Sequence, residues 1–424
     1  MRKINMRWQS VLLSVALLGL AACTGDFEDI NRNPNQVTEE QMDALNYKTG
    51  TKFKSLQSLV IPVQEHMYQF NESLSGGPFG GYIGATVDTW QTKFETYNPS
   101  ADWRKWPFAN VITETYTPYK GIINGTEDEV AIAFAKLLRV AIMHRVTDSY
   151  GPIPYTKLES NESVYVEYDS QEAVYRALLA DLEHANSLYD SSLKLPSAER
   201  DLLYKGDISK WRKFNNSLYL RLLMRLSNRN AAMGVAAKIA EIFNNPDRYP
   251  VFASNGDNAK MSYESVEPFV NYWGTKLNTQ FTTSTGRRPA EQIVDMMNHS
   301  GDPRIGIWFQ QPSGAEGWKG GQSGIESQEA DFTGIANLNK ANLGDYASPY
   351  ALMKYDEVLF IQAEAIQRGW IAGDAAACYQ NAIRASINYW KEVDTTGLNI
   401  TDKVIENFLA NVPYDLSLIH ISEP

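Results

Sequence analysis

Residues 350–391 contain the pattern that most constrains how this chain can fold. Two runs of apolar or small residues, each with a three- to four-residue period, flank the interruption Gly369-Trp370-Ile371-Ala372-Gly373. The periodic positions are Tyr355, Leu359, Ala363 and Ile366 in the first run, and Ala375, Tyr379, Ala382 and Ile383 in the second. Two amphipathic runs joined by a short glycine-containing break are typical of a helical hairpin.

The small residues of this hairpin stand where two helices approach closely. Ala363 is followed by Ala375, by the aromatic Tyr379 and then by Ala382, which is the spacing of a tetratricopeptide-type helix pair. An ordinary helical hairpin could show the same spacing. A pair of this kind cannot bury its apolar face alone, so further helices must stack on it. We therefore predict a mostly α-helical fold.

Further helices are predicted from apolar stripes and capping residues. They cover residues 38–69, 129–146, 170–189, 210–227, 231–243 and 401–409, with another near 289–297. Asn216 and Ser217 lie inside the apolar helix 210–227, and we expect them to satisfy backbone groups of a loop that packs there, rather than to bind a ligand. Residues 82–119 hold about twice the chain's average density of aromatic residues, and most of these are expected in the core.

Residues 244–349 differ in character from the helical segments. Glycine, serine and asparagine become frequent, the periodicity fades, and aromatic residues stand singly. We predict a loop-rich insertion between the scaffold segments 38–243 and 350–410. Loops held on a rigid scaffold are where binding residues gather.

The amino terminus has the pattern of a lipoprotein signal peptide over residues 1–22. Three positive charges precede an apolar run that is too short to span a bilayer, and Leu20-Ala21-Ala22-Cys23 follows. Cleavage there would leave Cys23 to carry the lipid, followed by a polar tether to residue 37. Cys378 would then be the remaining cysteine of the sequence, so no disulfide is expected.

Two longer runs resemble the signatures of the SusD/RagB-like outer-membrane lipoproteins. One is Tyr355–Ala365 with the following Arg368-Gly369-Trp370, and the other is Gly206–Leu218. The turn Tyr150–Tyr155 and the acidic residues after Cys23 also resemble this family. The resemblance implies a SusD-like fold over residues 38–414. Residues 415–424 do not resemble the carboxyl-terminal segment of such proteins, so we expect a non-native tail on a chain truncated at its carboxyl terminus.

Catalytic motifs are scarce. The five histidines are scattered without zinc-binding spacing, and neither a phosphate-binding loop nor a nucleophile elbow occurs in the sequence. The formal net charge of −11 argues against binding to nucleic acid, which needs basic side chains to neutralise phosphates. We expect no enzyme activity, cofactor or metal. A surface glycoside hydrolase stays an alternative, because the spacing of two carboxylates is a three-dimensional property.

The resemblance implies a lipid-anchored protein on the outer face of the outer membrane. It would bind oligosaccharides and deliver them to a SusC-like TonB-dependent transporter, and a RagB-type peptide binder is the alternative. Sugar rings lie against flat aromatic rings while their hydroxyls need polar partners. The candidate ligand-binding residues are therefore Trp90, Trp273, Trp308 and Trp318.

Overall fold

The computed structural model describes residues 47–60, 75–84, 94–159, 165–189, 195, 198–266, 270–271, 273–274, 277, 287–324 and 332–415. The predicted signal peptide, Cys23, the tether and Trp90 lie outside these ranges. So does the predicted tail, apart from its first residue. The predicted helix 38–69 is confirmed over Tyr47–Val60 (α4), and its remaining residues lie outside the described part.

Helices dominate the described part of the chain, as predicted. The longer ones are α8 (Ala101–Ile123), α9 (Glu129–Tyr150), α10 (Gln171–Leu188), α11 (Ile208–Arg225), α13 (Val235–Asn244), α15 (Glu291–Ser300), α18 (Tyr355–Gln367), α19 (Ala375–Val393) and α20 (Asp402–Asn411). Short helices are α6 (Gly77–Phe79), α12 (Asn230–Met233), α16 (Ile305–Trp308) and α17 (Lys340–Leu343). Single 3-10 turns cover Thr156–Leu158, Ala198–Arg200, Ser227–Arg229 and Asn255–Asp257.

Side-chain caps explain where the main helices begin. Asp128 accepts hydrogen bonds from the backbone N–H groups of Val130 and Ala131 at the start of α9. Asp374 does the same for Ala377 at the start of α19. These bonds satisfy N–H groups that have no partner within the helix. Helix α9 ends at Gly151, whose φ of 76° few other residues adopt readily.

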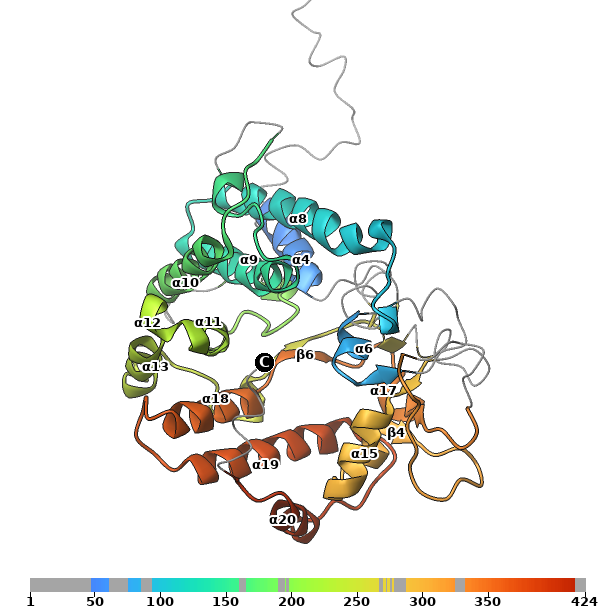
Figure 1. Ribbon diagram of the computed structural model, residues 1–424. Coiled ribbons are helices and arrows are strands. Elements are labelled where there is room, and N and C mark those ends of the chain that lie inside the picture. Colours follow the sequence, from blue (N-terminus) through green and yellow to red (C-terminus); the bar gives the residue numbers. More distant parts are fainter. Residues whose placement is uncertain are drawn as a thin grey trace, which may run out of the picture. The chain divides into compact units, whose positions relative to one another are not determined.

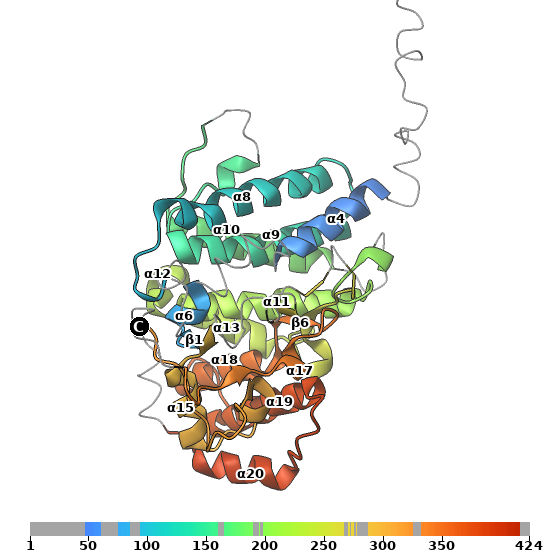
Figure 2. The same cartoon turned by 90° about the vertical axis from the view of Figure 1, so that its right-hand side faces the viewer.

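The main helices stack one on another. Helix α9 packs against α8 and α10, α11 packs against α9, α10, α13 and α18, and α18 packs along α19, which contacts α20. Figures 1 and 2 show this succession from α8 at the top to α20 at the bottom. The predicted hairpin is therefore confirmed as α18 and α19, and further helices pack on it, α11 against α18 and α20 against α19.

Three pairs of short antiparallel strands join distant segments. Strand β1 (Ile83–Gly84) pairs with β3 (Arg288–Pro289), and β4 (Phe309–Gln310) pairs with β5 (Asn337–Leu338). Strand β2 (Ala259–Met261) pairs with β6 (Tyr350–Met353), where Ala259 lies opposite Met353. The chain thus leaves the helical stack at β2 and returns to it beside the same strand, immediately before α18.

Trp211 lies at the centre of the largest apolar cluster. Its side chain is fully buried and contacts the rings of Phe134, Phe53 and Tyr204 at centroid distances of 4.7, 5.8 and 5.6 Å. Its Nε1 donates a 2.8 Å hydrogen bond to the buried carboxylate of Asp201. Asp201 also accepts from the backbone N–H groups of Leu203, Tyr204 and Gly206. The second family-like run, 206–218, is therefore a core element.

A buried ion-pair cluster joins α9 to α10. The guanidinium of Arg139 lies between the rings of Tyr119 and Tyr155, 4.2 and 4.5 Å from their centroids. It is paired with Asp181 and Glu159. The ammonium group of Lys136 lies 2.9 Å from Asp181. Burial alone would raise the pKa of Asp181, but the positive charges of Arg139 and Lys136 outweigh it and hold that pKa below its ordinary value.

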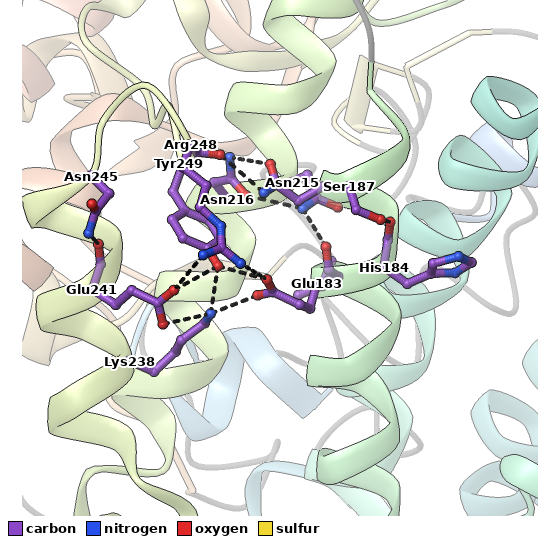
Figure 3. A network of polar contacts seen from close by, with 12 residues as sticks. Glu183, His184, Ser187, Asn215, Asn216, Lys238, Glu241, Asn245, Arg248 and Tyr249 are labelled. Carbon is purple, nitrogen blue, oxygen red and sulfur yellow. Dashed lines mark hydrogen bonds and ion pairs between the residues drawn. The ribbon is translucent and has the colours of Figure 1, made fainter.

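Asn216 and Ser217 have the structural role that their sequence position predicts. The amide of Asn216 donates 3.0 Å hydrogen bonds to the backbone carbonyl of Pro250 and to the side-chain oxygen of Asn186. The Oγ of Ser217 accepts from the N–H of Phe252. Figure 3 shows Asn216 beside a second network, in which Glu183 on α10 and Glu241 on α13 share Lys238, Arg248 and the hydroxyl of Tyr249. These contacts fix the segment that follows α13.

Candidate functional site

A groove of about 980 Å³ is walled by aromatic side chains. It lies where residues 75–79 and 94–108, the last turns of α9 and the segment near Tyr168 come together. Its aromatic lining comprises Phe79, Phe94, Trp103, Phe108, Tyr150 and Tyr168. We call this cavity the aromatic groove.

Turns in the sequence position these rings. The Gly76–Gly81 segment forms the short helix α6 and a turn that ends at Gly81, whose φ is 71°, so Phe79 projects from a glycine-rich bend. The hydroxyl of Ser100 caps α8 by accepting from the N–H of Trp103, which fixes the first turn of the helix beneath the groove. The ring of Trp103 stacks on Phe94 at a centroid distance of 5.8 Å.

Phe79, which lines the aromatic groove, forms an exposed parallel pair of rings with Tyr97, which does not line it. Phe79 and Tyr97 are 47% and 75% exposed, respectively. Their centroids are 4.9 Å apart and their planes differ by 6°. Contiguous exposed apolar surface is typical of interaction and ligand-binding sites. The pair therefore offers a flat surface to a ligand.

Polar side chains also line the groove, among them Arg104, Arg145, Asp148 and Ser149. The hydroxyl of Tyr150 donates a 2.6 Å hydrogen bond to the backbone oxygen of Arg104, which holds the ring against the wall. Burial raises the pKa of Asp148, although the Tyr175 hydroxyl and the Arg225 guanidinium both contact its carboxylate. Hydroxyl-bearing ligands would find donors and acceptors here.

The described tryptophans predicted to bind ligand lie elsewhere. All three are half-buried, and neither Trp273, Trp308 nor Trp318 lines the aromatic groove. Trp308 packs edge-on against Trp390 at 5.2 Å and lies under the guanidinium of Arg304. Trp318 packs on the cluster that includes Val294, and Trp273 packs on Ile83. A binding role for these residues stays a prediction, as it does for Trp90, and the structure does not bring the three together in one cavity.

Sequence reasoning missed the aromatic groove because it assigned most aromatic residues of 82–119 to the core. That assignment is wrong for Tyr82 and Tyr97, which are 56% and 75% exposed, although Phe94, Tyr116 and Tyr119 are buried. The local signal was the glycine-rich bend that carries Phe79, followed by the dense aromatic segment. Which of these rings face outward depends on α8, a helix that the sequence did not predict.

Neither a metal-binding group of side chains nor a membrane-spanning helix occurs among the described residues. No three histidine, cysteine, aspartate or glutamate side chains among them gather closely enough to hold a metal ion. None of the helices within the described ranges is long and apolar enough to cross a membrane.

The family model described as "SusD-like: Starch-binding associating with outer membrane" matches residues 48–420. The chain belongs to the SusD-like family. SusD-like proteins are glycan-binding proteins of the outer membrane. No functionally curated protein sequence matches the chain. The family membership that the two signatures in the sequence indicated is thus confirmed.

Solved structures of SusD homologues agree with this SusD-like fold. One from Bacteroides thetaiotaomicron is 34% identical with a TM-score of 0.71, and the match covers 86% of this chain and 72% of that one. One from Bacteroides uniformis is 28% identical with a TM-score of 0.74, covering 86% and 73%. A SusD homologue from Flavobacterium johnsoniae, described as chitin-binding, is 24% identical with a TM-score of 0.70, covering 81% and 71%. That last likeness shows the fold alone.

Proposed function

We propose that this SusD-like protein is a surface-exposed lipoprotein that binds oligosaccharides in the aromatic groove and delivers them to a SusC-like TonB-dependent transporter. The exposed parallel pair of Phe79 and Tyr97 carries the proposal. A sugar ring has an apolar C–H face that fits a flat aromatic ring, and its hydroxyls require hydrogen-bonding partners. The groove offers both, since Arg104, Asp148 and Ser149 lie along the same cavity.

The carboxylate content of the aromatic groove favours a protein that binds glycans without hydrolysing them. Glycoside hydrolases use two carboxyl groups on opposite sides of the scissile bond. Among the described residues that line the groove, Asp148 is the one with a carboxylate. This carboxylate accepts a hydrogen bond from the hydroxyl of Tyr175 and forms an ion pair with Arg225. This supports capture over hydrolysis. An exposed aromatic surface favours a sugar ligand over the extended backbone of a peptide. The peptide alternative is tested by including peptides in the same binding experiment.

The test of the groove is calorimetric titration of the mature protein in detergent with oligosaccharide and peptide panels. Starch-type and N-acetylglucosamine oligomers belong in the first panel, and product analysis on the same samples detects any hydrolysis. Phe79→Ala and Tyr97→Ala should each weaken glycan binding about tenfold, as loss of an aromatic anchor does. Phe360→Ala, which removes a ring that is 39% exposed on α18, is the matched control and should leave the affinity unchanged.

Two outcomes would contradict the binding proposal. One is equal affinity of Tyr97→Ala and the unaltered protein for a glycan that binds saturably. The other is binding to peptides with no response to any glycan. Released sugar fragments that disappear on Asp148→Asn would favour the hydrolase alternative instead.

Surface display is tested separately. The lipid on Cys23 should hold the protein at the outer face of the outer membrane, because several acyl chains anchor stably where one does not. Protease added to intact cells should therefore digest the protein, and Cys23→Ser should move it from the membrane fraction to the soluble fraction. Protection from external protease in intact cells would contradict an exterior position. Recovery of the transporter with the affinity-tagged protein tests the partnership.

A further inference from the structure

A second cavity of about 730 Å³ shares lining residues with the aromatic groove. Arg145 and Asp148 line both, so the two spaces adjoin. Residues of α9, α11, α18 and β6 line the second cavity, and these elements lie next to one another in Figure 1. Its volume falls in the range of about 300–1,000 Å³ that small-molecule sites usually have. It therefore has room for part of a ligand that also occupies the groove.

Helices α11 and α18 each turn one face to the second cavity. The lining residues follow one another at the three- and four-residue steps of a single helix face. On α11 they include Phe214, Leu218, Arg221 and Arg225, and on α18 with the arginine that follows it they are Glu357, Ile361, Glu364 and Arg368. Each face thus carries both apolar and charged side chains.

The charged groups of this lining are already paired with one another. The ion pairs are Arg221–Glu357, Arg225–Asp148 and Arg368–Glu364, at 2.5, 2.9 and 2.8 Å. The remaining guanidinium of the lining, that of Arg145, donates to the backbone oxygen of Val60. We call this space the ion-pair cavity. A ligand carboxylate or ammonium group would have to displace one of these partners from the described lining residues.

Two of the paired side chains keep hydrogen-bonding capacity. Arg221 uses its Nε and Nη2 on Glu357 and on the backbone oxygen of Leu352, and its Nη1 makes no hydrogen bond within the described part of the chain. Glu364 accepts from Arg368 through Oε1, which leaves Oε2 without a hydrogen bond to the described residues. The ion-pair cavity therefore offers a donor and an acceptor that are held in place by their ion pairs.

His144 adds a buried acceptor to the ion-pair cavity. The residue is 5% exposed and belongs to the lining. Its Nδ1 lies 2.9 Å from the backbone oxygen of Val140, which can only accept, so Nδ1 carries the proton and Nε2 is an acceptor. Burial lowers the pKa of His144 to about 3, and the charge of Arg221 acts in the same direction. The ring is therefore neutral, and its Nε2 has no hydrogen-bond partner among the described residues.

A hydroxyl group matches these three atoms. It both donates and accepts hydrogen bonds, so it can donate to Nε2 of His144 and accept from Nη1 of Arg221. A carboxylate only accepts and cannot serve His144, whereas an ammonium group only donates and cannot serve Arg221. Bringing either charge into the cavity is also costly when the opposite charges are already paired. The chemistry of the lining thus favours an uncharged ligand with several hydroxyl groups.

We propose that the ion-pair cavity binds a neutral sugar residue of an oligosaccharide whose other rings lie in the aromatic groove. The inference rests on the proposed function, and it narrows the ligand class to glycans with an uncharged sugar at this position. Hydroxyl groups of that sugar donate to His144 and Glu364 and accept from Arg221. The rings and side chains of Phe214 and Leu218, in the same lining, provide an apolar surface for its C–H groups.

The first experiment uses the unaltered mature protein, so it does not depend on the folding of a variant. Starch-type and N-acetylglucosamine oligomers, from the disaccharide upwards, are titrated beside the same oligomers oxidised at C6 to uronates. Oxidation adds a carboxylate and keeps the linkage and the length. A long neutral oligomer should bind at least about tenfold more tightly than its oxidised form. The ratio should be smaller for the disaccharide, which is too short to occupy both spaces.

The second experiment removes the acceptor of Glu364. Glu364→Leu keeps most of the volume of the side chain and should weaken the binding of long neutral oligomers about tenfold, more than it weakens that of the disaccharide. Glu172→Leu is the matched control, because Glu172 also pairs with an arginine one helical turn later but lies on α10 and lines neither cavity. It should leave the affinities unchanged. Phe79→Ala, in contrast, should weaken short and long oligomers alike.

The outcomes separate this inference from the proposed function. Oxidised oligomers that bind as tightly as the neutral ones, or more tightly, would overturn the neutral subsite. So would an unchanged affinity of Glu364→Leu for a long oligomer whose binding Phe79→Ala weakens, and that result would leave capture in the groove intact. The absence of binding to any oligosaccharide would overturn the proposed function and this inference together.

Discussion

Replacing Arg139 with methionine should lower the free energy of unfolding by about 3–5 kcal/mol, the usual cost of removing one partner from a buried ion pair. Arg139 is 2% exposed, and its guanidinium lies between Tyr119 and Tyr155. Methionine keeps much of the volume but leaves Glu159 and Asp181 without this partner. Urea denaturation followed by circular dichroism measures the change.

A matched surface variant and a pH series provide the controls for Arg139. Arg176→Met breaks an exposed pair and should cost less than about 1 kcal/mol. The folded-state pKa of Asp181 is depressed below its ordinary value of 3.8. Asp181 therefore contributes to the free energy of unfolding at pH values above 3.8, and this contribution is lost as the pH falls through the folded-state pKa. The stability difference between the unaltered protein and Arg139→Met should therefore shrink below about pH 4. A difference that stays constant at acidic pH would contradict the ion-pair explanation.

Trp211→Ala should destabilise the protein by at least about 3–5 kcal/mol, the range for truncating a buried aromatic side chain. The cavity would open where α11 meets Phe134 of α9 and Phe53 of α4. The substitution also removes the indole donor from Asp201, a carboxylate with no exposed surface. Both the lost packing and the lost hydrogen bond act in the same direction, and urea denaturation measures their sum.

Trp211→Phe separates the two contributions to the Trp211 effect. It retains most of the ring but not the N–H, so it should cost about 1–3 kcal/mol through the hydrogen bond to Asp201. Tyr165→Ala, which removes a side chain that is 89% exposed, should change the stability by less than about 0.5 kcal/mol. A loss for Trp211→Phe as large as that for Trp211→Ala would show that packing contributes little.

Helices with one apolar stripe and a capping residue were predictable from the sequence. Helices α9, α10, α11, α18 and α19 lie within a few residues of their predicted bounds. The predicted helix 231–243 divides into α12 and α13 because Gly234 adopts a left-handed conformation, with φ 65°. The role of Asn216 was also predictable, because an amide inside an apolar stripe needs a buried partner.

Helix α8 was not predictable from the same signals. It contains Pro107 and Pro118, which normally argue against a helix interior, and its aromatic residues do not form a single stripe. The aromatic groove was missed for a related reason. Its walls come from residues 75–108, from the end of α9 and from Tyr168, and only the packing of α8 on α9 brings these segments together.

A crystal structure of the protein with a bound oligosaccharide tests the central claim most directly. The account predicts a sugar ring lying parallel to the exposed face of Tyr97 beside Phe79, with the chain running along the aromatic groove towards Asp148. A sugar chain bound instead against Trp273 or Trp318, with the groove empty, would contradict it.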